Sequence, residues 1–427
     1  MDPTEKNWIS KYLDERSKFA LDLPPNNSLS TGELIYKVLQ PTGILYGHPL
    51  SLPIPIDTTP WPLKERLEVI LLESFISSYL IYHKINKPTN LDLKEAINKS
   101  IEFYEQSFPE LLKRGFLEMP AKTPELQLEK IISKRILVKP EWNAHFWRGF
   151  FHNILLFVDV LTFIEFMEAG ENMAEINWQK RILEFQYYII HLLAVITTLN
   201  SDKKESVNLY NYFVSSTNFS KKEKEDFQNN YRQPEIQKVI QFLSRSNWLV
   251  RKYFLELGLL SIWADNTIDT DEQAFIEHFE SKLQLDSIEI ETSSFAVESY
   301  VFLNWEKVHY LQSKQSLLVL SKRMTHRMKK ISHKYAHEIK SEINENKELI
   351  SLLRTSQKRP LSIDEREKVR QQLIDVLKTI PAFVVLAMPM AFLSVPILMK
   401  VLPKNIFPSS FNPNKIVNQR GNKIIEG

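Results

Sequence analysis

Four carboxylates cluster within eight residues near the middle of the chain, between two apolar stretches with helical spacing. They are Asp265, Asp269, Asp271 and Glu272. Their oxygens are the ligands that a hard cation such as calcium prefers. An EF-hand loop is excluded, because counting from Asp265 puts Thr270 where the loop needs glycine and Ile276 where it needs a bidentate glutamate. The alternative is helix capping by Asp269 or Thr270, with Glu272 in the first turn.

The second candidate site is a basic amphipathic helix, which the sequence predicts over residues 316–343. Its apolar face is formed at helical spacing by Leu317, Leu320, Met324, Met328, Ile331, Tyr335 and Ile339. Its other face carries Lys322, Arg323, Arg327, Lys329, Lys330 and Lys334. Between Lys314 and Lys340, eight Lys or Arg residues stand against one acid, Glu338. Such a face would bind phosphates of anionic lipid or of ribosomal RNA in a salt-dependent way. The alternative is a solvated face of a helix packed in its own bundle.

The sequence contains no enzyme motif that we recognise. Cysteine is absent, which excludes disulfides, thiolate catalysis and cysteine-bound metals. Glycine occurs only nine times, and the stretch from Gly43 to Gly47 matches neither a P-loop nor a dinucleotide fingerprint. His337-Glu338 begins like a zincin motif, but Ser341 stands where the second histidine is required. We therefore expect no enzymatic activity and no cofactor, apart from a divalent cation at the acidic turn.

Helical spacing of apolar residues dominates the chain, so the sequence predicts an all-α fold. Two strongly apolar helices, at about 142–167 and 178–199, are interpreted as buried core helices, because neither has the roughly 18–20 uncharged residues of a membrane span. Charged runs flank a polar stretch over 202–226, which predicts an interdomain linker containing a short helix. Strand-like alternation is clear only at Ser287–Thr292, which is too short to form a sheet.

The uncharged stretch from Thr379 to Met399 lies between Lys378 and Lys400. As a helix it would cover about 30 Å, the thickness of the hydrocarbon core, and it is the stretch that meets this length requirement. The sequence therefore predicts one C-terminal transmembrane helix. Membrane helices tolerate internal proline, and its prolines recur at spacings of eight, seven and seven, at Pro381, Pro389, Pro396 and Pro403. The alternative is a buried, proline-broken helix or a re-entrant hairpin.

Residues 360–413 resemble the membrane segment of the LETM-like family (leucine-zipper, EF-hand-containing transmembrane proteins). The resemblance is carried by the proline spacing and by the closing Phe407-Pro-Ser-Ser-Phe411. The matching positions include Pro381, Pro389, Phe392, Pro396, Lys400, Pro403, Pro408 and Phe411. The resemblance implies an inner-membrane protein linked to cation/proton homeostasis, with a ribosome-binding domain after the span. In the family's best-known members an acidic residue lies within the span, near the position of Phe392.

The acidic turn carries a second resemblance. Ile262-Trp-Ala-Asp-Asn266-x-Ile-Asp269-x-x-Glu272-x-x-Phe-Ile276 is similar to the helix–turn–helix signature of TerB-like (tellurite-resistance-type) domains. This resemblance implies a small helical bundle over about 215–305. The family's usual glycine after the first Asp is replaced by Asn266, which tolerates the left-handed backbone of such a turn.

Together these features predict four regions: an N-terminal helical domain (1–205), a TerB-like helical domain (206–305), a basic helical connector (306–359) and a LETM-like membrane segment with a short tail (360–427). The leading hypothesis is a non-enzymatic scaffold or tether at a bacterial inner membrane, with its N-terminal bulk in the cytoplasm. It would contact membrane lipid, and ribosomes or another protein through the basic helix, with no DNA partner expected. The alternatives are an oligomeric component of cation/proton exchange and a soluble protein-binding module with a buried C-terminal segment.

Overall fold

The computed structural model describes residues 1–21, 29–113, 120–136, 153–199, 204–263, 270–304, 314–378, 394–403 and 406. Within these ranges every regular element is a helix, so the all-α prediction is confirmed. The chain forms two compact units, Met1–Gln284 and Leu285–Gly427. The four regions predicted from the sequence remain a prediction, because one compact unit can contain more than one domain.

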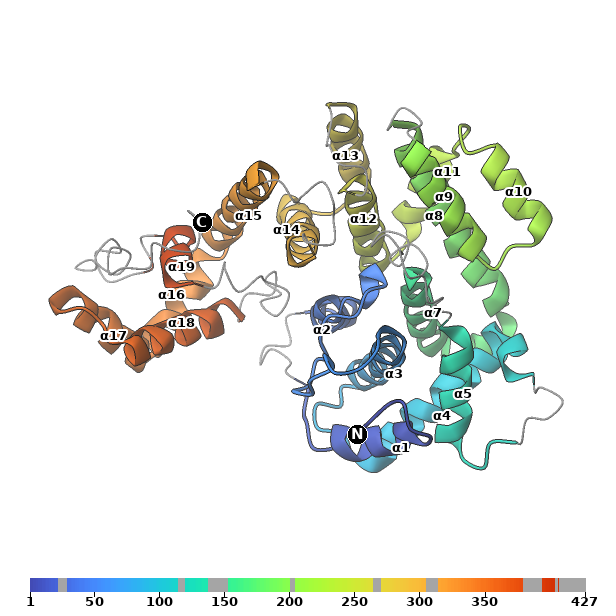
Figure 1. Ribbon diagram of the computed structural model, residues 1–427, viewed down its shortest axis with the longest axis horizontal. Coiled ribbons are helices and arrows are strands. Elements are labelled where there is room, and N and C mark those ends of the chain that lie inside the picture. The colour runs from blue at the N-terminus through green and yellow to red at the C-terminus, as the bar shows by residue number, and fades with distance from the viewer. Residues whose placement is uncertain are drawn as a thin grey trace. The chain divides into compact units, whose positions relative to one another are not determined.

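The first unit contains helices that are labelled in Figure 1. They are α1 (Trp8–Arg16), α2 (Thr31–Leu39), α3 (Leu63–Tyr82), α4 (Asn90–Ser107), α5 (Pro124–Arg135), α7 (Leu155–Ala169), α8 (Trp178–Leu199), α9 (Lys204–Ser216), α10 (Lys221–Asn229), α11 (Ile236–Arg245), α12 (Trp248–Trp263) and α13 (Thr270–Lys282). Short 3₁₀ turns lie at η1 (Gln40–Thr42), η2 (Ile44–Tyr46), η3 (Pro109–Leu112) and η4 (Gly170–Glu175).

Helix α3 is central in one half of this unit, because it packs against α2, α4, α5 and α7. Its residues from Leu67 to Ile81 are all buried, which fits a helix covered by neighbours on several sides. Aromatic rings fill the contact with α4 and α7, where Phe75 lies 4.7 Å from Phe163 and 5.8 Å from Phe103 between ring centroids. The apolar residues of α3, α4 and α7 thus pack together around Phe75.

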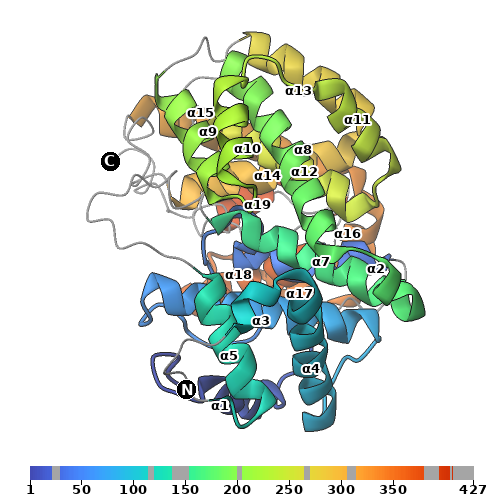
Figure 2. The same cartoon turned by 90° about the vertical axis from the view of Figure 1, so that its right-hand side faces the viewer.

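Helix α8 is central in the other half and begins and ends where the sequence predicted. It packs against α4, α7, α9, α11, α12 and α13, and Figure 2 shows it beside α9, α11 and α12. Among the helices that the structure describes, α8 is the one whose length and composition would let it cross a membrane. Its apolar stretch is 61% buried within the unit, which agrees with the interpretation as a core helix.

Buried carboxylates connect the helices of the first unit. Glu73 on α3 accepts hydrogen bonds from Tyr12 (2.7 Å) and Arg16 (3.0 Å) on α1. A second pair joins Asp159 on α7 to Arg135 on α5, at 2.7 Å between Nε and Oδ2. Removing one partner of such a buried pair would leave the other charge uncompensated, at a cost of about 3–5 kcal/mol.

A tight turn with two left-handed glycines lies between α2 and α3. Gly43 has φ 79° and Gly47 has φ 62°, a region that favours glycine. A Cβ on Gly47 would lie 2.6 Å from the carbonyl carbon of Asn153 and from the amide nitrogen of Ile154. Glycine at position 47 therefore allows the turn to approach the backbone at the start of α7.

The predicted linker at 202–226 is wrong for the described part of that range. Residues 204–216 form α9 and 221–229 lie in α10, and both helices belong to the first unit. Tyr210, Phe213 and Val214 are buried, and α9 packs against α8. The charged runs at each end concealed this apolar face, which has the spacing of an amphipathic helix.

The second unit contains α14 (Ser287–Leu303), α15 (Lys314–Lys334), α16 (Ala336–Glu345), α17 (Lys347–Lys358), α18 (Ile363–Lys378) and α19 (Val395–Val401). The strand-like alternation at Ser287–Thr292 is misleading, because these residues form the first turns of α14. Asp286 caps that helix, since its side chain accepts from the backbone N–H of Glu289 while Glu289 accepts from the backbone N–H of Asp286. This reciprocal capping favours a helix start over a strand.

Candidate functional site

The basic helix predicted from the sequence is α15, and it packs against α14, α16 and α19. Figure 1 shows α14 beside α15 in the second unit. The predicted apolar face is confirmed where side chains are described, because Leu320, Met324, Met328 and Ile331 are buried. These residues hold α15 in the unit and leave its opposite side toward solvent.

Five of the six predicted cations are exposed on α15, and four of them have no ion-pair partner among the described residues, namely Lys322, Arg323, Lys329 and Lys334. At 100° per residue they fall within about half of the helix circumference. None of the four forms an ion pair with another residue that the structure describes. His326 and His333 are exposed on the same side, and α15 contains no Asp or Glu. We call these four cations the α15 basic face.

Two exposed apolar residues lie one turn before the basic face. Leu318 is 45% exposed and Val319 is 48% exposed. At helical spacing they precede Lys322 and Arg323 by four residues, so they extend the same side of α15. The described exposed side of this helix is therefore apolar at Leu318 and Val319 and carries its cations from Lys322 to Lys334.

The other two predicted cations are held by acids of α14. Arg327 Nε lies 3.1 Å from Glu298 Oε2 and also pairs with Glu291, and Lys330 Nζ lies 2.7 Å from Glu291 Oε1. These pairs join α14 to α15 and neutralise much of the two positive charges. Arg327 is therefore a positioning residue for the helix pair, whereas Lys330 is exposed beside the α15 basic face and differs from its four cations by its pairing with Glu291.

Burial and pairing shift the pKa values of these acids in opposite directions. Burial raises the pKa of Glu298, which is 3% exposed, despite the opposing field of Arg327. Partial burial also acts to raise the pKa of Glu291, but hydrogen bonds and charges from Lys330 and Arg327 outweigh it and lower this pKa below its usual value. Of these two acids, Glu291 is therefore the more readily ionised.

The sequence did not identify Glu291 and Glu298 as partners of the basic helix. Their spacing of seven residues places them on one side of α14, which was the available signal. The strand-like pattern at the start of that helix masked this spacing. A contact between two helices also depends on tertiary packing, which periodicity alone does not determine.

The predicted cation site at the acidic turn lies largely outside the described residues. Asp265 and Asp269 fall in the range 264–269, and the side chains of Asp271 and Glu272, in the first turn of α13, are also undescribed. Of the described residues on each side, α12 ends at Trp263 and α13 begins at Thr270. No cluster of His, Asp or Glu suited to a metal ion occurs among the residues that the structure describes.

The predicted transmembrane helix is not one unbroken helix as far as Met399. Residues 379–393, with Pro381, Pro389 and Phe392, lie outside the described part, as do Pro408 and Phe411. Ser394 has an extended backbone directly before α19, so a continuous helix through residue 394 is excluded. Pro396 explains the break, because proline is favourable in a first helical turn and disfavoured inside a helix.

Helix α19 belongs to the folded second unit. It packs against α15 and α18, with Leu398, Met399 and Val401 buried and Lys400 exposed. Pro403 is buried directly after it. The final residues of the predicted span therefore contribute to the protein core at the back of the basic helix.

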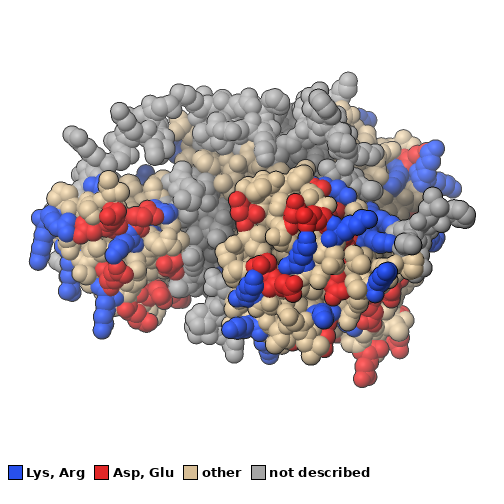
Figure 3. Space-filling model, turned by 60° about the horizontal axis from the view of Figure 1, so that its bottom comes forward, with Lys and Arg blue, Asp and Glu red and all other residues tan. Residues whose placement is uncertain are grey.

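The whole chain has no strong electrostatic field. Its formal net charge is +2, and Figure 3 shows acidic and basic side chains interspersed on the face that it presents. Binding of a polyanion would then depend on a local surface such as the α15 basic face.

A comparison with protein families gave a match in the C-terminal part of the chain. Residues 361–425 match the family model described as LETM1-like, RBD. The matched range contains α18 and α19 and overlaps most of the range 360–413 that resembled this family in the sequence. No curated protein and no solved structure matches the chain. The match shows that the C-terminal segment is similar to the LETM1-like family.

Proposed function

We propose that this protein is a non-enzymatic, membrane-associated scaffold of the LETM-like kind that contacts ribosomal RNA through the α15 basic face. The observation that carries the proposal is the α15 basic face, whose four exposed cations have no ion-pair partner among the described residues. The helix that carries them contains no Asp or Glu, and it belongs to the same unit as the LETM1-like, RBD match. RNA helices present regularly spaced phosphates, which such a row neutralises without reading sequence.

The surrounding packing suits the basic face to this role. Helices α14 and α19 hold α15 from behind, and the acids of α14 pair with Arg327 and Lys330 rather than with the four exposed cations. The exposed cations are therefore accessible to a partner, and one helix holds them at regular spacing. A LETM-like family is also not a classical enzyme family, which agrees with the missing reaction motifs.

Ribosome binding is tested by co-sedimentation of the full chain with purified ribosomes. We expect the variant Lys322→Glu/Arg323→Glu/Lys329→Glu/Lys334→Glu to remain in the supernatant at a salt concentration at which the wild type pellets. The matched control reverses four exposed lysines of the first unit, Lys87→Glu, Lys94→Glu, Lys122→Glu and Lys222→Glu, and has the same net charge. Equal pelleting of the two variants would contradict a specific role of α15.

Membrane association is proposed to come from the uncharged residues 379–393. Their sequence has the apolar composition of a membrane segment, and Lys378 at the end of α18 stands directly before it. As a helix these residues would cover about 22 Å, which is shorter than the hydrocarbon core and favours a re-entrant or interfacial segment over a full span.

Alkaline carbonate extraction of membranes tests this part of the proposal. The wild type is expected to stay with the membrane, whereas the double variant Val385→Lys/Met390→Lys is expected to be released. The reason is that inserting each lysine into the hydrocarbon core costs about 3 kcal/mol of free energy. Leu91→Lys, at a position that is 67% exposed in the first unit, is the control and should stay with the membrane. Retention of both variants would show that another segment holds the protein.

A further inference from the structure

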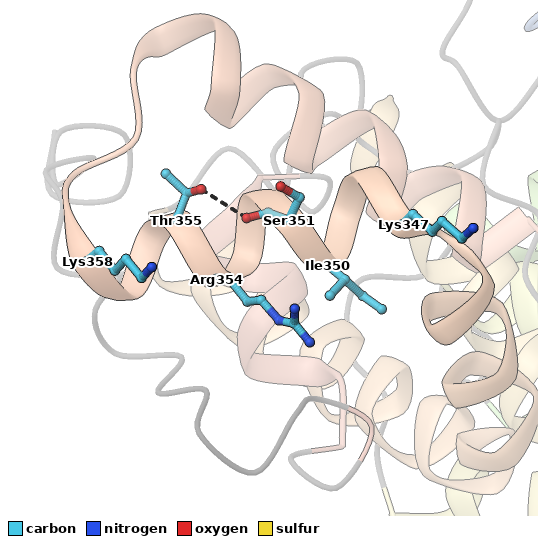
Figure 4. A pocket seen from close by; sticks show the side chains of 6 residues that line it. All are labelled: Lys347, Ile350, Ser351, Arg354, Thr355 and Lys358. Atoms are coloured by element: carbon cyan, nitrogen blue, oxygen red, sulfur yellow. Dashed lines mark hydrogen bonds between the residues drawn. The ribbon is translucent and has the colours of Figure 1, made fainter.

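A surface hollow of about 480 Å³ lies along α17, apart from the α15 basic face. The described residues that line it all come from α17, and they are Lys347, Ile350, Ser351, Arg354, Thr355 and Lys358. Figure 4 shows Arg354 and Ile350 projecting from the same side of the helix, between Lys347 at one end and Lys358 at the other. Cations thus stand at both ends of this row of residues and at Arg354 between them, with Ile350 as its one apolar side chain.

The cations of the hollow are not engaged elsewhere in the described part of the chain. Lys347, Arg354 and Lys358 are exposed, and none forms an ion pair with another described residue. The acid of α17 is turned away from them, because Glu348 pairs with Lys368 of α18 at 3.6 Å and accepts a hydrogen bond from Gln372. No carboxylate therefore competes for the hollow from its own helix.

The hydroxyl groups of the hollow have different roles. Thr355 donates its hydroxyl hydrogen to the backbone oxygen of Ser351 at 3.0 Å, which is the dashed line in Figure 4. The Ser351 hydroxyl is exposed and has no hydrogen bond to another described residue, so it remains a donor for a ligand. The hollow thus offers one planar guanidinium, two ammonium groups and one hydroxyl as donors.

This set of donors suits a phosphate better than a carboxylate. A guanidinium binds two phosphate oxygens at once, and the flanking ammonium groups balance further negative charge. A phosphate monoester carries nearly two negative charges near neutral pH, whereas a carboxylate carries one. Lys347 and Lys358 are separated by about 16 Å along the helix axis, a length that accommodates more than one phosphate.

We infer that the α17 hollow binds the phosphate groups of a small phosphorylated ligand, with Arg354 as the bidentate contact and Lys347, Lys358 and Ser351 as flanking donors. Ile350 supplies an apolar contact for the organic part of such a ligand. The inference goes beyond ribosome contact, because none of these residues belongs to the α15 basic face.

Titration calorimetry of the full chain in detergent, at low salt, tests the site with two soluble probes. Pyrophosphate represents a free phosphate compound, and short-chain phosphatidic acid represents a lipid headgroup, with short-chain phosphatidylcholine as its neutral reference. Binding of pyrophosphate identifies a free phosphate ligand. Binding of phosphatidic acid alone, without phosphatidylcholine, identifies a lipid phosphate. Either result supports the site if it depends on Arg354.

Two variants at position 354 test whether binding depends on Arg354. Arg354→Gln is expected to weaken binding of the active probe about tenfold, the effect of one lost charge-assisted contact, and Arg354→Lys to restore part of the affinity. The control Lys340→Gln removes an exposed cation on α16 that pairs with no described acid, and it should bind like the wild type. The inference is overturned if neither probe binds, if Arg354→Gln binds normally, or if Lys340→Gln loses affinity equally.

Discussion

Arg327 differs from the other cations of α15 in its surroundings. It lies between Glu291 and Glu298 of α14, and its side chain is 27% exposed, whereas that of Glu298 is 3% exposed. Removing the guanidinium would leave a buried carboxylate without its closest partner. The energetic cost of the change would then come mainly from Glu298 and would depend on whether that side chain is ionised.

We therefore predict that Arg327→Met destabilises the second unit by about 2–3 kcal/mol near neutral pH. Burial already raises the pKa of Glu298, and loss of Arg327 raises it further. A carboxyl group whose folded-state pKa is raised contributes stability that is present while it is protonated and is lost as pH rises through that pKa. The stability deficit should accordingly be smaller in mild acid than at neutral pH, as measured by thermal unfolding. A deficit independent of pH would contradict this reasoning, and Lys329→Met is the exposed control.

Gly47 shows a different kind of constraint on a single residue. Its φ of 62° and the 2.6 Å that would separate an added Cβ from the backbone at Asn153 and Ile154 both exclude a side chain. We predict that Gly47→Ala destabilises the first unit by more than about 2 kcal/mol, from left-handed strain together with steric overlap.

The matched control for this prediction is Gly258→Ala. Gly258 lies inside α12, where an added Cβ would meet Phe279 at 3.9 Å and Leu192 at 4.0 Å, both ordinary contacts. Alanine there should stabilise the helix by about 0.5–1 kcal/mol. Chemical denaturation of both variants provides the comparison, and equal effects of the two changes would contradict it.

At the scale of elements, α19 carries the clearest difference between sequence and structure. A composition argument assigns its residues to a membrane span, whereas the structure packs them on α15 and α18. Leu398→Ala is predicted to destabilise the second unit by about 3 kcal/mol, because Leu398 is fully buried. Lys400→Ala, on the exposed side of the same helix, should change little. Thermal unfolding that is insensitive to Leu398→Ala would instead favour the membrane interpretation of these residues.

Elements with strong periodicity could be predicted from the sequence, and those with mixed signals could not. Helix α8 was predicted with the correct ends because its apolar residues recur without interruption. Helix α9 was interpreted as part of a linker, since its buried residues Tyr210 and Phe213 stand among charged runs. The start of α14 was interpreted as strand-like, although Asp286 and Glu289 have the spacing of a capping box.

The candidate site could likewise be predicted from the sequence only in part. The α15 basic face follows from helical periodicity, which requires no knowledge of neighbouring helices. The engagement of Arg327 and Lys330 by α14 does not follow from it, because those contacts join residues about 30 to 40 positions apart. The hollow along α17 also depends on how α17 and α18 pair, which places Glu348 away from the three cations.

At the scale of the whole molecule, a net charge of +2 with interspersed charges gives little general attraction to a polyanion. The proposed ribosome contact therefore depends on one local surface of the second unit, the α15 basic face. A local surface predicts a definite number of phosphate contacts, and that number is measurable as the dependence of affinity on salt.

The most direct test is the salt dependence of ribosome affinity for the full chain and its variants. For the wild type, the logarithm of affinity should fall linearly with the logarithm of salt, and each α15 cation that contacts phosphate should add slightly less than one unit to the slope. Lys322→Gln should then reduce the slope by about one unit, whereas the control Lys222→Gln should leave it unchanged. A wild-type affinity that does not change with salt, or equal slopes for all three proteins, would contradict ribosome contact through the α15 basic face.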